Sequence, residues 1–536
     1  MHKPIPKLKK TNTIHWIITS IFLFLSNYAY SQPVFLKLNT ETNLRFEKIF
    51  YDQIEFQSNI KPFLISEIPS FDSLSPKLEI KKNNIFLDKL LNDNILENKS
   101  NQFRIYANPI VQLSPVFGNN PKEIINNYRV GLTIGGNIGK QFAFQFDGFY
   151  GLQSYTQDFV SRIDSSGIIP AYGKYLGKTS SGYQYASITG YLSYSPSKYF
   201  NLQTGIGGNF WGDGYRSLFL SDNSANYPFL KATVNIWRFK YLWLIGYLRD
   251  FNSDIPNNTL KSKLIFSHYL SWNATKWLNI NFFESIVSNP VDSMGVTYFN
   301  IAYLNPVIFY RPVEFAGGSA DNALLGFGFK LKLYKKYQFY GQVLFDEFVW
   351  AQMKSGNGWW GNKFGIQAGL KVFDLLNIKN LYLQIELNDV RPYTYSYSNS
   401  NLNYGNQFQP LAHPTGANFG ETIILAHYHK NRFSVLAKAV ISSAGLDIDS
   451  ISYGQDIYKP YTHRQGDYNN KFLQGFKGNY YHIELKMDWL INPKLNHSIF
   501  VSIIKQNRNS SSSNFQNTCF SIGIRYLLRN DELDYL

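Results

Sequence analysis

The sequence has one cysteine in 536 residues, which excludes an internal disulfide framework and any cysteine-rich zinc or iron–sulfur site. It is also poor in charge, because Asp, Glu, Lys and Arg make up 17% of the residues, against roughly 25% in soluble chains. Long apolar runs are scarce as well. Residues 14–25 form the one long run, and no later stretch approaches the ~18 uncharged residues that a membrane-spanning helix needs. The sequence therefore excludes a helical membrane protein.

Aromatic residues are abundant instead. Phe, Trp and Tyr together account for 17% of the chain, with 39 Tyr, 43 Phe and 10 Trp residues. A β-rich chain with many aromatics and few charges is typical of an outer-membrane β-barrel, whose strands give a much weaker hydropathy signal than membrane helices. The predicted fold class is therefore all-β, an antiparallel transmembrane barrel.

Period-two alternation supports this fold class. The clearest case is 380–388, where one face carries Leu381, Leu383, Ile385 and Leu387, and the other carries Tyr382, Gln384, Glu386 and Asn388. The same alternation recurs in 141–148, 199–209, 337–347 and 515–528. A soluble sandwich would also alternate. The polar face here, however, is rich in Gly, Gln, Asn and Tyr, as a water-filled barrel interior requires.

The spacing of the strand-like runs is more discriminating. Short connections fall near 137–139, 195–198, 238–239, 274–276, 335–336, 374–379, 430–431 and 492–495. Longer connections alternate with them, near 114–126, 153–183, 211–228, 250–259, 289–324, 349–361, 389–418, 444–478 and 507–514. Bacterial barrels have short periplasmic turns and longer extracellular loops. The pattern therefore predicts about 18 strands with both termini in the periplasm.

The N-terminus has the features of a secretory signal peptide. Lys3, Lys7, Lys9 and Lys10 form a basic start before the apolar run, and Ala29-Tyr30-Ser31 is a small-x-small site. Cleavage after Ser31 is expected, so residues 1–31 are assigned as signal peptide. The alternative is an uncleaved anchor helix. Loss of the four lysines lowers the formal net charge from +15 to +11. The chain is still basic, which suits acidic glycans or lipid phosphates, while nucleic acid is not expected as a partner of an exported chain.

Residues 32–100 carry many charges and lack the hairpin rhythm, so they are predicted to form a separate N-terminal periplasmic segment. Within it, 83–98 has the apolar stripe of a helix. This stretch could be a plug under the barrel or a tethered linker. The barrel itself is predicted to span 101–530, and 531–536 is left as a C-terminal tail.

Four motifs in the long loops mix Gly or Pro with Arg, Asp, Asn and aromatic residues. They are WGDGYRSLFLSD (211–222), NPVIFYRPVEFAGGSADN (305–322), GNGWWGNK (356–363) and QPLAHPTGANF (409–419). Flat aromatic faces beside planar hydrogen-bonding groups suit sugar rings, and Arg suits acidic sugars. The candidate polysaccharide-binding residues are Asp213, Tyr215, Arg216, Tyr310, Arg311, Glu314, Asp321, Trp359, Trp360 and His413. Alternatively, these loops fold inward and close the pore through salt bridges.

Signals of enzymatic activity are weak. Residues 317–321 come close to the nucleophile-elbow pattern, but Asp321 replaces its final Gly and no strand–turn–helix context is present. His427 and His429 share one face of a strand and could bind a metal, although a polar pair facing the barrel interior explains them as well. We therefore expect no catalytic residues, no metal and no cofactor.

The strings GDGYRSLFLSDN, NPVIFYRPVEF with GGSADNALLG, and QPLAHPTGANFGE resemble the capsule-assembly protein Wzi family in its Bacteroidota branch. That branch includes gliding-motility proteins of the RemB type. The resemblance extends from about residue 100 to 528. It implies a monomeric outer-membrane barrel with a helical periplasmic part. It also implies a lectin-like, non-enzymatic role in attaching capsular polysaccharide. The alternatives are a solute pore and an accessory of gliding or adhesion.

Overall fold

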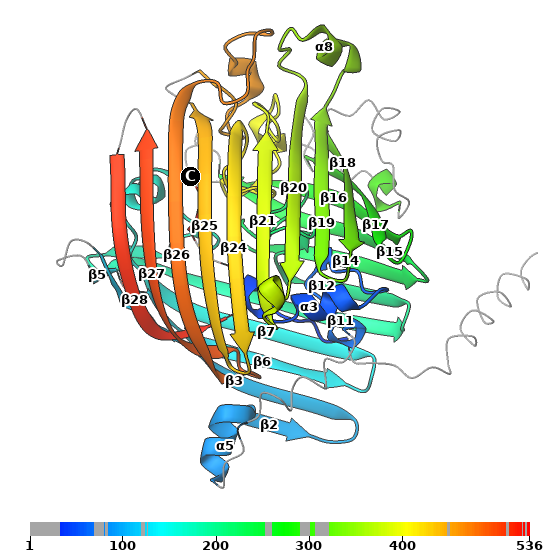
Figure 1. Ribbon diagram of the computed structural model, residues 1–536, viewed down its shortest axis with the longest axis vertical. Helices are drawn as coiled ribbons and strands as arrows, with labels where there is room; N and C mark the ends of the chain where they lie inside the picture. Colours follow the sequence, from blue (N-terminus) through cyan, green and yellow to red (C-terminus); the bar gives the residue numbers. More distant parts are fainter. Residues whose placement is uncertain are drawn as a thin grey trace, which may run out of the picture.

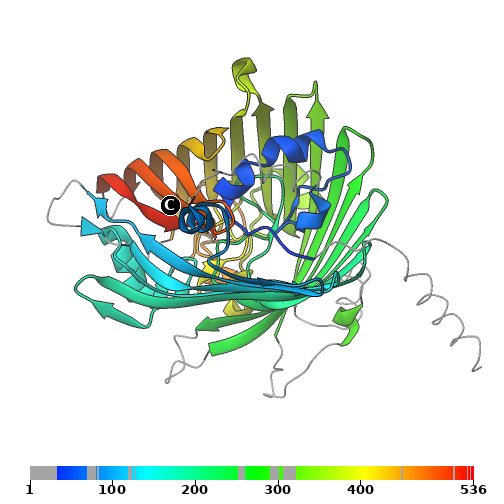
Figure 2. The same cartoon turned by 90° about the horizontal axis from the view of Figure 1, so that it is seen from below.

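The computed structural model describes residues 33–68, 80, 84–118, 124–125, 127–251, 260–289, 301–305, 321–447, 451–510, 514–527, 529–530 and 533–535. Within these residues the chain forms a closed antiparallel β-barrel of 18 wall strands, as the spacing predicts (Figure 1). Seen along the barrel, the strands form a ring around an interior that other segments fill (Figure 2). We call this interior the lumen.

The wall strands follow one another around the barrel in chain order. They are β3 (Phe103–Leu113), β6 (Asn127–Ile138), β7 (Phe142–Gln153), β11 (Gly182–Ser197), β12 (Phe200–Gly207), β14 (Tyr227–Ile236), β15 (Phe239–Phe251), β16 (Leu260–Asn273), β17 (Leu278–Ser288), β18 (Asn322–Leu333), β19 (Tyr337–Glu347), β20 (Lys363–Phe373), β21 (Leu381–Val390), β24 (Phe419–Lys430), β25 (Phe433–Leu446), β26 (Phe476–Asn492), β27 (His497–Ser510) and β28 (Asn514–Tyr526).

Short turns join the strands at one end of the barrel and longer connections join them at the other. We call these the short-turn end and the long-loop end. Each predicted short connection lies within a few residues of an observed turn, so the strand count and the alternation of connections are confirmed. Exposed aromatics gather at the short-turn end. Trp237, Tyr334 and Trp277 are 89%, 86% and 52% exposed, as residues of an interfacial girdle are.

The alternation along each strand separates a lipid-facing side from a lumen side. In β21 the predicted apolar face points outward, and Ile385 and Leu387 are exposed. Glu386 and Asn388, on the other face, are fully buried among lumen side chains. The wall therefore presents hydrocarbon to lipid, where an outward charge at the bilayer midplane costs about 2–4 kcal/mol.

The barrel closes through a short seam between its first and last strands. In the described residues, β28 pairs with β3 at Ile524↔Leu113. It pairs with β4 (Val116–Phe117) at Phe520↔Phe117 and Ser521↔Val116. By contrast, β27 and β28 pair along their whole length. Near the short-turn end, the edge of β3 is covered by β2 (Leu96–Lys99). The seam thus depends on side-chain contacts more than the rest of the wall does.

Side chains from the N-terminal segment bridge this seam from inside. Lys37 bonds Asp147 of β7 at 3.0 Å on one side and the hydroxyl of Tyr526 of β28 on the other. Glu41 forms ion pairs with Arg525 of β28 and with Lys486 of β26 at 3.0 Å. This segment therefore fastens strands on both sides of the closure.

The N-terminal segment 33–68 fills the short-turn end of the lumen. It contains α2 (Thr40–Leu44), α3 (Glu47–Asp52), β1 (Ile60–Lys61) and η1 (Ile65–Glu67), and Figure 2 shows its helices inside the ring. Tyr51 packs on Phe373 of β20 with ring centroids 4.4 Å apart. Strand β1 pairs with β13 (Phe210–Trp211), a short strand inside the barrel. The segment is thus built into the lumen.

The predicted helix over 83–98 is shorter in the structure. Helix α5 covers Ile85–Asn92 and begins at Asn84, whose side chain accepts hydrogen bonds from the amides of Phe86 and Leu87. The chain is extended at Asp93, and 96–99 form β2 on the edge of β3. The unpaired edge of β3 offers ladder hydrogen bonds that a continued helix would leave unmade, which explains the correction. Helix α5 lies beyond the short-turn end of the barrel (the lower end in Figure 1), where Asn492 donates to the Leu90 carbonyl at 3.0 Å.

Two long connections fold into the lumen and pack on each other. They are 208–226, between β12 and β14, and 391–418, between β21 and β24. Trp211, Phe219 and Leu220 of the first share a buried apolar cluster with Leu402 and Leu411 of the second. The alternative in which these loops fold inward therefore describes 208–226 and 391–418.

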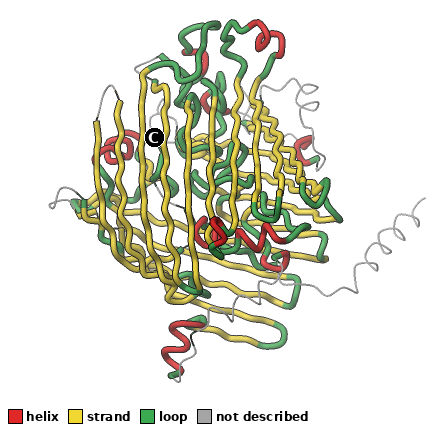
Figure 3. The backbone as a smooth tube through the Cα atoms, viewed as in Figure 1, coloured by secondary structure: helices red, strands yellow, loops and turns green. Residues whose placement is uncertain are grey.

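The remaining elements are short (Figure 3). They are β5 (Ile124–Ile125), α6 (Gln157–Ser166), β8 (Ile168–Ile169), β9 (Gly173–Lys174), β10 (Gly177–Thr179), η3 (Ile301–Leu304), α8 (Trp350–Ser355), η4 (Leu375–Asn377), η5 (Ser400–Leu402), β22 (Gly405–Asn406), β23 (Gln409–Pro410) and η6 (Tyr461–His463). In the described part of the chain, no helix has both the length and the apolar character needed to cross a membrane.

Candidate functional site

Five of the predicted polysaccharide-binding residues lie on the inward-folded loops or beside them. The first of these is Asp213. Its carboxylate accepts a hydrogen bond from the Ser58 hydroxyl at 2.8 Å and pairs with Lys330 of β18 at 3.2 Å. Asp213 is 4% exposed. It therefore joins the N-terminal segment to the wall, and its carboxylate is already held by groups of this chain.

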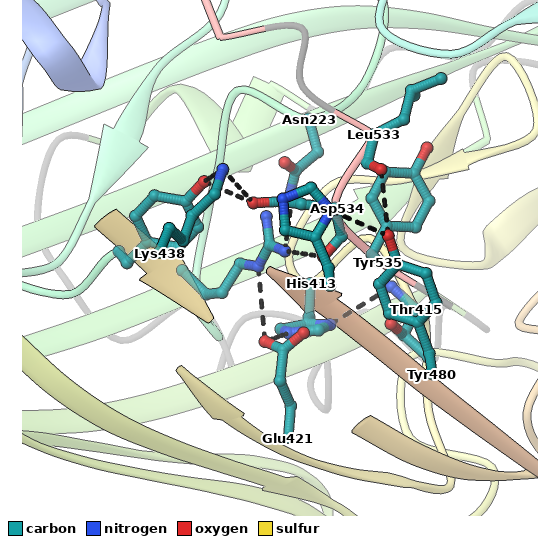
Figure 4. Close-up of polar contacts among 12 residues, drawn as sticks. Asn223, His413, Thr415, Glu421, Lys438, Tyr480, Leu533, Asp534 and Tyr535 are labelled. Atoms are coloured by element: carbon teal, nitrogen blue, oxygen red, sulfur yellow. Dashed lines mark hydrogen bonds and ion pairs between the residues drawn. The ribbon is translucent and has the colours of Figure 1, made fainter. Parts of the chain in front are cut away.

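Tyr215, Arg216 and His413 belong to one polar cluster in the lumen. Figure 4 shows the cluster and labels its His413, Glu421 and Asp534. Arg216 pairs with Asp534 of the C-terminal tail at 2.7 Å and with Glu421 of β24 at 3.4 Å. His413 Nε2 lies 2.8 Å from the same Glu421 carboxylate. Burial would lower the pKa of Arg216, but the carboxylates of Asp534 and Glu421 outweigh it and raise that pKa well above its ordinary value. The cluster is a closed set of ion pairs.

Glu386 of β21 holds the loop 208–226 in place. Its carboxylate accepts hydrogen bonds from the backbone amides of Tyr215 at 2.7 Å and Arg216 at 3.0 Å. It also accepts from the Tyr340 hydroxyl at 2.7 Å and the Asn388 amide at 3.0 Å. With the Gln384 amide at 3.4 Å, five donors converge on one buried carboxylate, and two of them are backbone amides that would lose their acceptor without it.

The buried imidazole of His413 predicts a pH dependence of stability. Burial lowers the pKa of His413 from its ordinary 6.5, despite Glu421. The unfolded chain therefore takes up this proton at a higher pH than the folded chain does. Titration of His413 does not change the free energy of unfolding well above pH 6.5. Below pH 6.5 it lowers that free energy as the pH falls, by up to about 1.4 kcal/mol per pH unit for one proton. In His413→Gln, urea unfolding between pH 7.5 and 5 should show a shallower decline.

The control for that series is His463→Gln, because His463 is exposed on η6. This variant should follow the parent chain across the whole pH range. If the free energy of unfolding of His413→Gln falls with pH as steeply as that of the parent, protonation of the buried imidazole does not contribute to the pH dependence.

Asp321, Tyr310, Arg311 and Glu314 belong to the connection between β17 and β18. Asp321 accepts a hydrogen bond from the Tyr303 hydroxyl at 2.7 Å, and its backbone carbonyl accepts one from Tyr397 at 3.4 Å. Tyr310, Arg311 and Glu314 lie outside the described residues. Asp321 is therefore placed beside the inner loop 391–418, apart from the ion-pair cluster of Arg216.

Trp359 and Trp360 have a different setting. They lie at the long-loop end on 348–362, which is hydrogen-bonded to the neighbouring long connection 447–475 (the upper end in Figure 1). The amide of Trp360 donates to the Asp467 carbonyl at 2.9 Å, and the amides of Asn469 and Asn470 donate to the carbonyls of Asn357 and Gly358, both at 2.9 Å. The two connections therefore form one surface.

That surface carries a compact aromatic and cationic group, which we call the rim cluster: Trp359, Trp360, Tyr461 and Arg464. The rings of Trp360 and Tyr461 have centroids 4.6 Å apart, and those of Trp359 and Trp360 are 6.0 Å apart. The Arg464 guanidinium lies over the Trp360 ring at 4.3 Å and bonds Asp467 at 2.7 Å. All four side chains are half-buried, so each keeps surface for a ligand.

Tight local geometry positions these rings. Gly358 has φ of +68°, and a Cβ there would lie 2.9 Å from the backbone nitrogen of Asn470. A Cβ on Gly361 would lie 2.5 Å from the Trp359 ring, which covers it. Only glycine allows both approaches, which gives the Gly spacing of the GNGWWGNK motif a structural reason.

Sequence reasoning selected Trp359 and Trp360 but missed Tyr461 and Arg464. The signal was present, because 458–468 mixes Tyr, Arg, Asp and Gly in a long connection just as the selected motifs do. The pairing of two connections that lie about 100 residues apart could not be read from the sequence.

In the described ranges, no group of three or more His, Cys, Asp or Glu side chains is arranged to hold a metal ion. The rings of His427 and His429 stack with centroids 5.5 Å apart, and His427 is buried on the lumen side of β24.

No known family matches the sequence, and no curated protein matches it either. Solved structures do match. Wzi of Escherichia coli, described as an outer membrane protein involved in group 1 capsule assembly and a carbohydrate-binding β-barrel, has a TM-score of 0.54 at 12% identity, covering 92% of this chain and 99% of that one. OprD of Pseudomonas aeruginosa has a TM-score of 0.39 at 9% identity, covering 79% and 94%. OccAB4 of Acinetobacter baumannii has 0.41 at 8%, covering 80% and 98%. The chain thus has a Wzi-like fold, that of an outer-membrane β-barrel.

Proposed function

We propose that this barrel binds surface polysaccharide at its long-loop end and helps to attach or organise it there, without catalysing a reaction. The observation that carries this proposal is the rim cluster. It places aromatic rings, tilted against one another, beside a guanidinium on two connections that are hydrogen-bonded to each other. Aromatic faces suit the apolar faces of sugar rings, and Arg464 suits carboxylates. The formal net charge is +15 for the full chain and +11 without the four lysines of residues 1–31, and this positive charge favours an acidic polymer.

This proposal includes an orientation. Residues 1–31 act as the signal peptide, the long-loop end faces outward from the cell, and the end filled by 33–68 faces the periplasm. Short periplasmic turns and long extracellular loops are the arrangement of bacterial barrels. The barrel acts as a monomer. Its partner is capsular polysaccharide, the ligand that the resemblance to the Wzi family implies.

A solute pore is the competing function. Support for a binding role over a pore comes from the filling of the lumen by 33–68, 208–226, 391–418 and the C-terminal tail. Reconstituted into planar bilayers, the intact chain is therefore expected to show no steady, large channels. Such channels would favour the pore and count against a closed binding protein.

Trp360→Ala tests the binding site directly. We expect the variant to bind the cell's surface polysaccharide about thirtyfold more weakly, because tryptophan anchors commonly contribute about 2 kcal/mol to an interface. Binding is measured by calorimetry on the purified barrel, and retention by capsule staining of cells that carry the variant. Arg464→Ala should weaken binding of an acidic polymer in the same way.

The matched control is Trp237→Ala, which removes an exposed tryptophan at the opposite end of the barrel. It should bind like the parent chain. Equal binding by Trp360→Ala, Arg464→Ala and the parent would contradict the rim as the glycan site. The gliding role that the RemB-type resemblance implies also needs glycan contact. Capsule staining and spreading assays on one deletion strain distinguish the two roles.

A further inference from the structure

The chain does not end at the wall. Strand β28 reaches the short-turn end at Tyr526. Yet Leu533 contacts Tyr480, Asp534 contacts Lys438, and Tyr535 contacts Arg508. Tyr480 and Arg508 face each other near the long-loop ends of β26 and β27. From here on we call residues 529–536 the tail, of which the structure describes 529–530 and 533–535. The tail therefore turns back beyond the last strand and lies inside the lumen (the C label in Figures 1 and 2).

The carboxylate of Asp534 is surrounded by donors from separate parts of the barrel. Tyr215 donates its hydroxyl at 2.6 Å, Arg216 lies at 2.7 Å, and Lys438 of β25 lies at 2.9 Å. The side chain of Asp534 is fully buried. Burial would raise the pKa of Asp534, but Arg216 and Lys438 outweigh it and hold that pKa far below its usual range.

The same site also reads the tail's backbone. Gln506 donates to the Leu533 carbonyl at 3.0 Å, and Tyr480 donates to it at 3.2 Å. Arg216 donates to the Asp534 carbonyl at 3.0 Å. Arg508 donates to the Tyr535 carbonyl at 2.9 Å. Three consecutive carbonyls are therefore bound by side chains of the loop 208–226 and of strands β26 and β27.

Side-chain packing and a second anchor complete the fit. The Tyr535 ring meets Phe159 of α6 edge to face, with centroids 6.2 Å apart. Earlier in the tail, Arg529 donates to the carbonyls of Asp222 at 2.8 Å and Ser224 at 3.1 Å. Asn530 accepts from the Thr40 amide at 2.8 Å. One carboxylate, several backbone carbonyls and one aromatic ring are thus each matched by a complementary group, as in peptide recognition.

We propose that the lumen contains a peptide-recognition site, formed by Tyr215, Arg216, Lys438, Tyr480, Gln506 and Arg508, whose ligand is the chain's own acidic C-terminal tail. Docking of the tail ties the last strand back to 208–226, to α6 and to β25–β27. It thereby reinforces a wall whose first and last strands share few backbone pairs. The tail also lines a lumen cavity of about 280 Å³ and restricts access to it.

The single cysteine supplies a reporter for this docking. Cys519 of β28 is buried and lines the same cavity as Leu533, Asp534 and Tyr535. Its rate of reaction with a hydrophilic maleimide should therefore follow the occupancy of the site. We compare the full chain with a chain that ends at residue 528, both purified in detergent.

Removal of 529–536 should raise the labelling rate at least about tenfold. An excess of a synthetic peptide of residues 529–536 should restore the slow rate, whereas the same peptide with Asn in place of Asp534 should not at the same concentration. An unchanged rate in the shortened chain would overturn the proposal. Equal action of the two peptides would overturn it as well, because the carboxylate would then play no part in recognition.

If the shortened chain fails to fold, the full-length variant Asp534→Asn takes its place. It keeps the shape of the tail and removes only the charge that Arg216 and Lys438 contact. We expect faster Cys519 labelling than in the parent, and slower labelling than in a doubly substituted Asp534→Asn, Tyr535→Ala chain. A parental rate in both variants would show that the tail does not govern access to this cavity.

Discussion

Replacing Glu386 with leucine should lower the free energy of unfolding by at least about 3 kcal/mol, because a hydrogen bond to a charged group is typically worth about 1.5–3 kcal/mol and this carboxylate accepts several. The change leaves the backbone amides of Tyr215 and Arg216 without their acceptor in a fully buried position. The loop 208–226 would then lose the contact that holds it across the lumen. Urea titration in detergent, followed by tryptophan fluorescence, measures the effect.

Two further variants interpret that result. Glu386→Gln keeps one acceptor oxygen and should lose less stability than the leucine variant. Asp164→Asn alters an ion pair with Lys178 that is about half exposed, and it should leave the free energy of unfolding close to that of the parent, because solvent screens exposed pairs. If the leucine variant unfolds at the same urea concentration as Asp164→Asn, and not at a much lower one, the loop is held by its apolar packing and not by Glu386.

Glu41→Gln should be nearly as damaging. Glu41 neutralises Arg525 and Lys486 from inside the barrel, and its side chain is 11% exposed. Removing one member of a buried ion pair typically costs about 3–5 kcal/mol, because the remaining charges stay buried without a partner. Here the loss falls at the seam, so β28 should separate from β3 and β4 before the rest of the wall opens.

Hydrogen exchange followed by mass spectrometry locates that opening. In Glu41→Gln, peptides from β28 and β3 should exchange faster than in the parent, while peptides from β19 to β21 should not. The control is Glu97→Gln, which alters a more exposed pair with Arg104 on β2 and β3 and should leave both regions unchanged. Uniform acceleration throughout the wall would mean that the barrel opens as one unit.

The wall could be predicted from the sequence because its determinants are local. Whether Leu387 faces lipid and Glu386 faces the lumen follows from period-two alternation, and the order of short and long connections follows from counting. The extent of α5 could not be predicted in the same way. Its apolar stripe continues past Asn92, and only the unpaired edge of β3 makes the extended conformation at 96–99 more favourable.

The lumen could be predicted only in outline. The motifs were visible, but the partners of their charges lie far away in the sequence. Asp213 meets Lys330, and Arg216 meets Asp534, across more than 100 and 300 residues. A charged loop residue that binds a glycan and one that pairs inside the barrel have the same local sequence. Trp359 and Trp360 differ from the buried candidates only because a second connection holds them at the surface.

The segment 33–68 has a consequence for the assembly of the barrel in the cell. Its strand β1 pairs with β13 deep inside, while the wall that encloses both ends with the last strand of the chain. Lys37 and Glu41 of this segment hold strands on both sides of the seam, so the seating of 33–68 and the closure of the wall should stabilise each other as the barrel assembles.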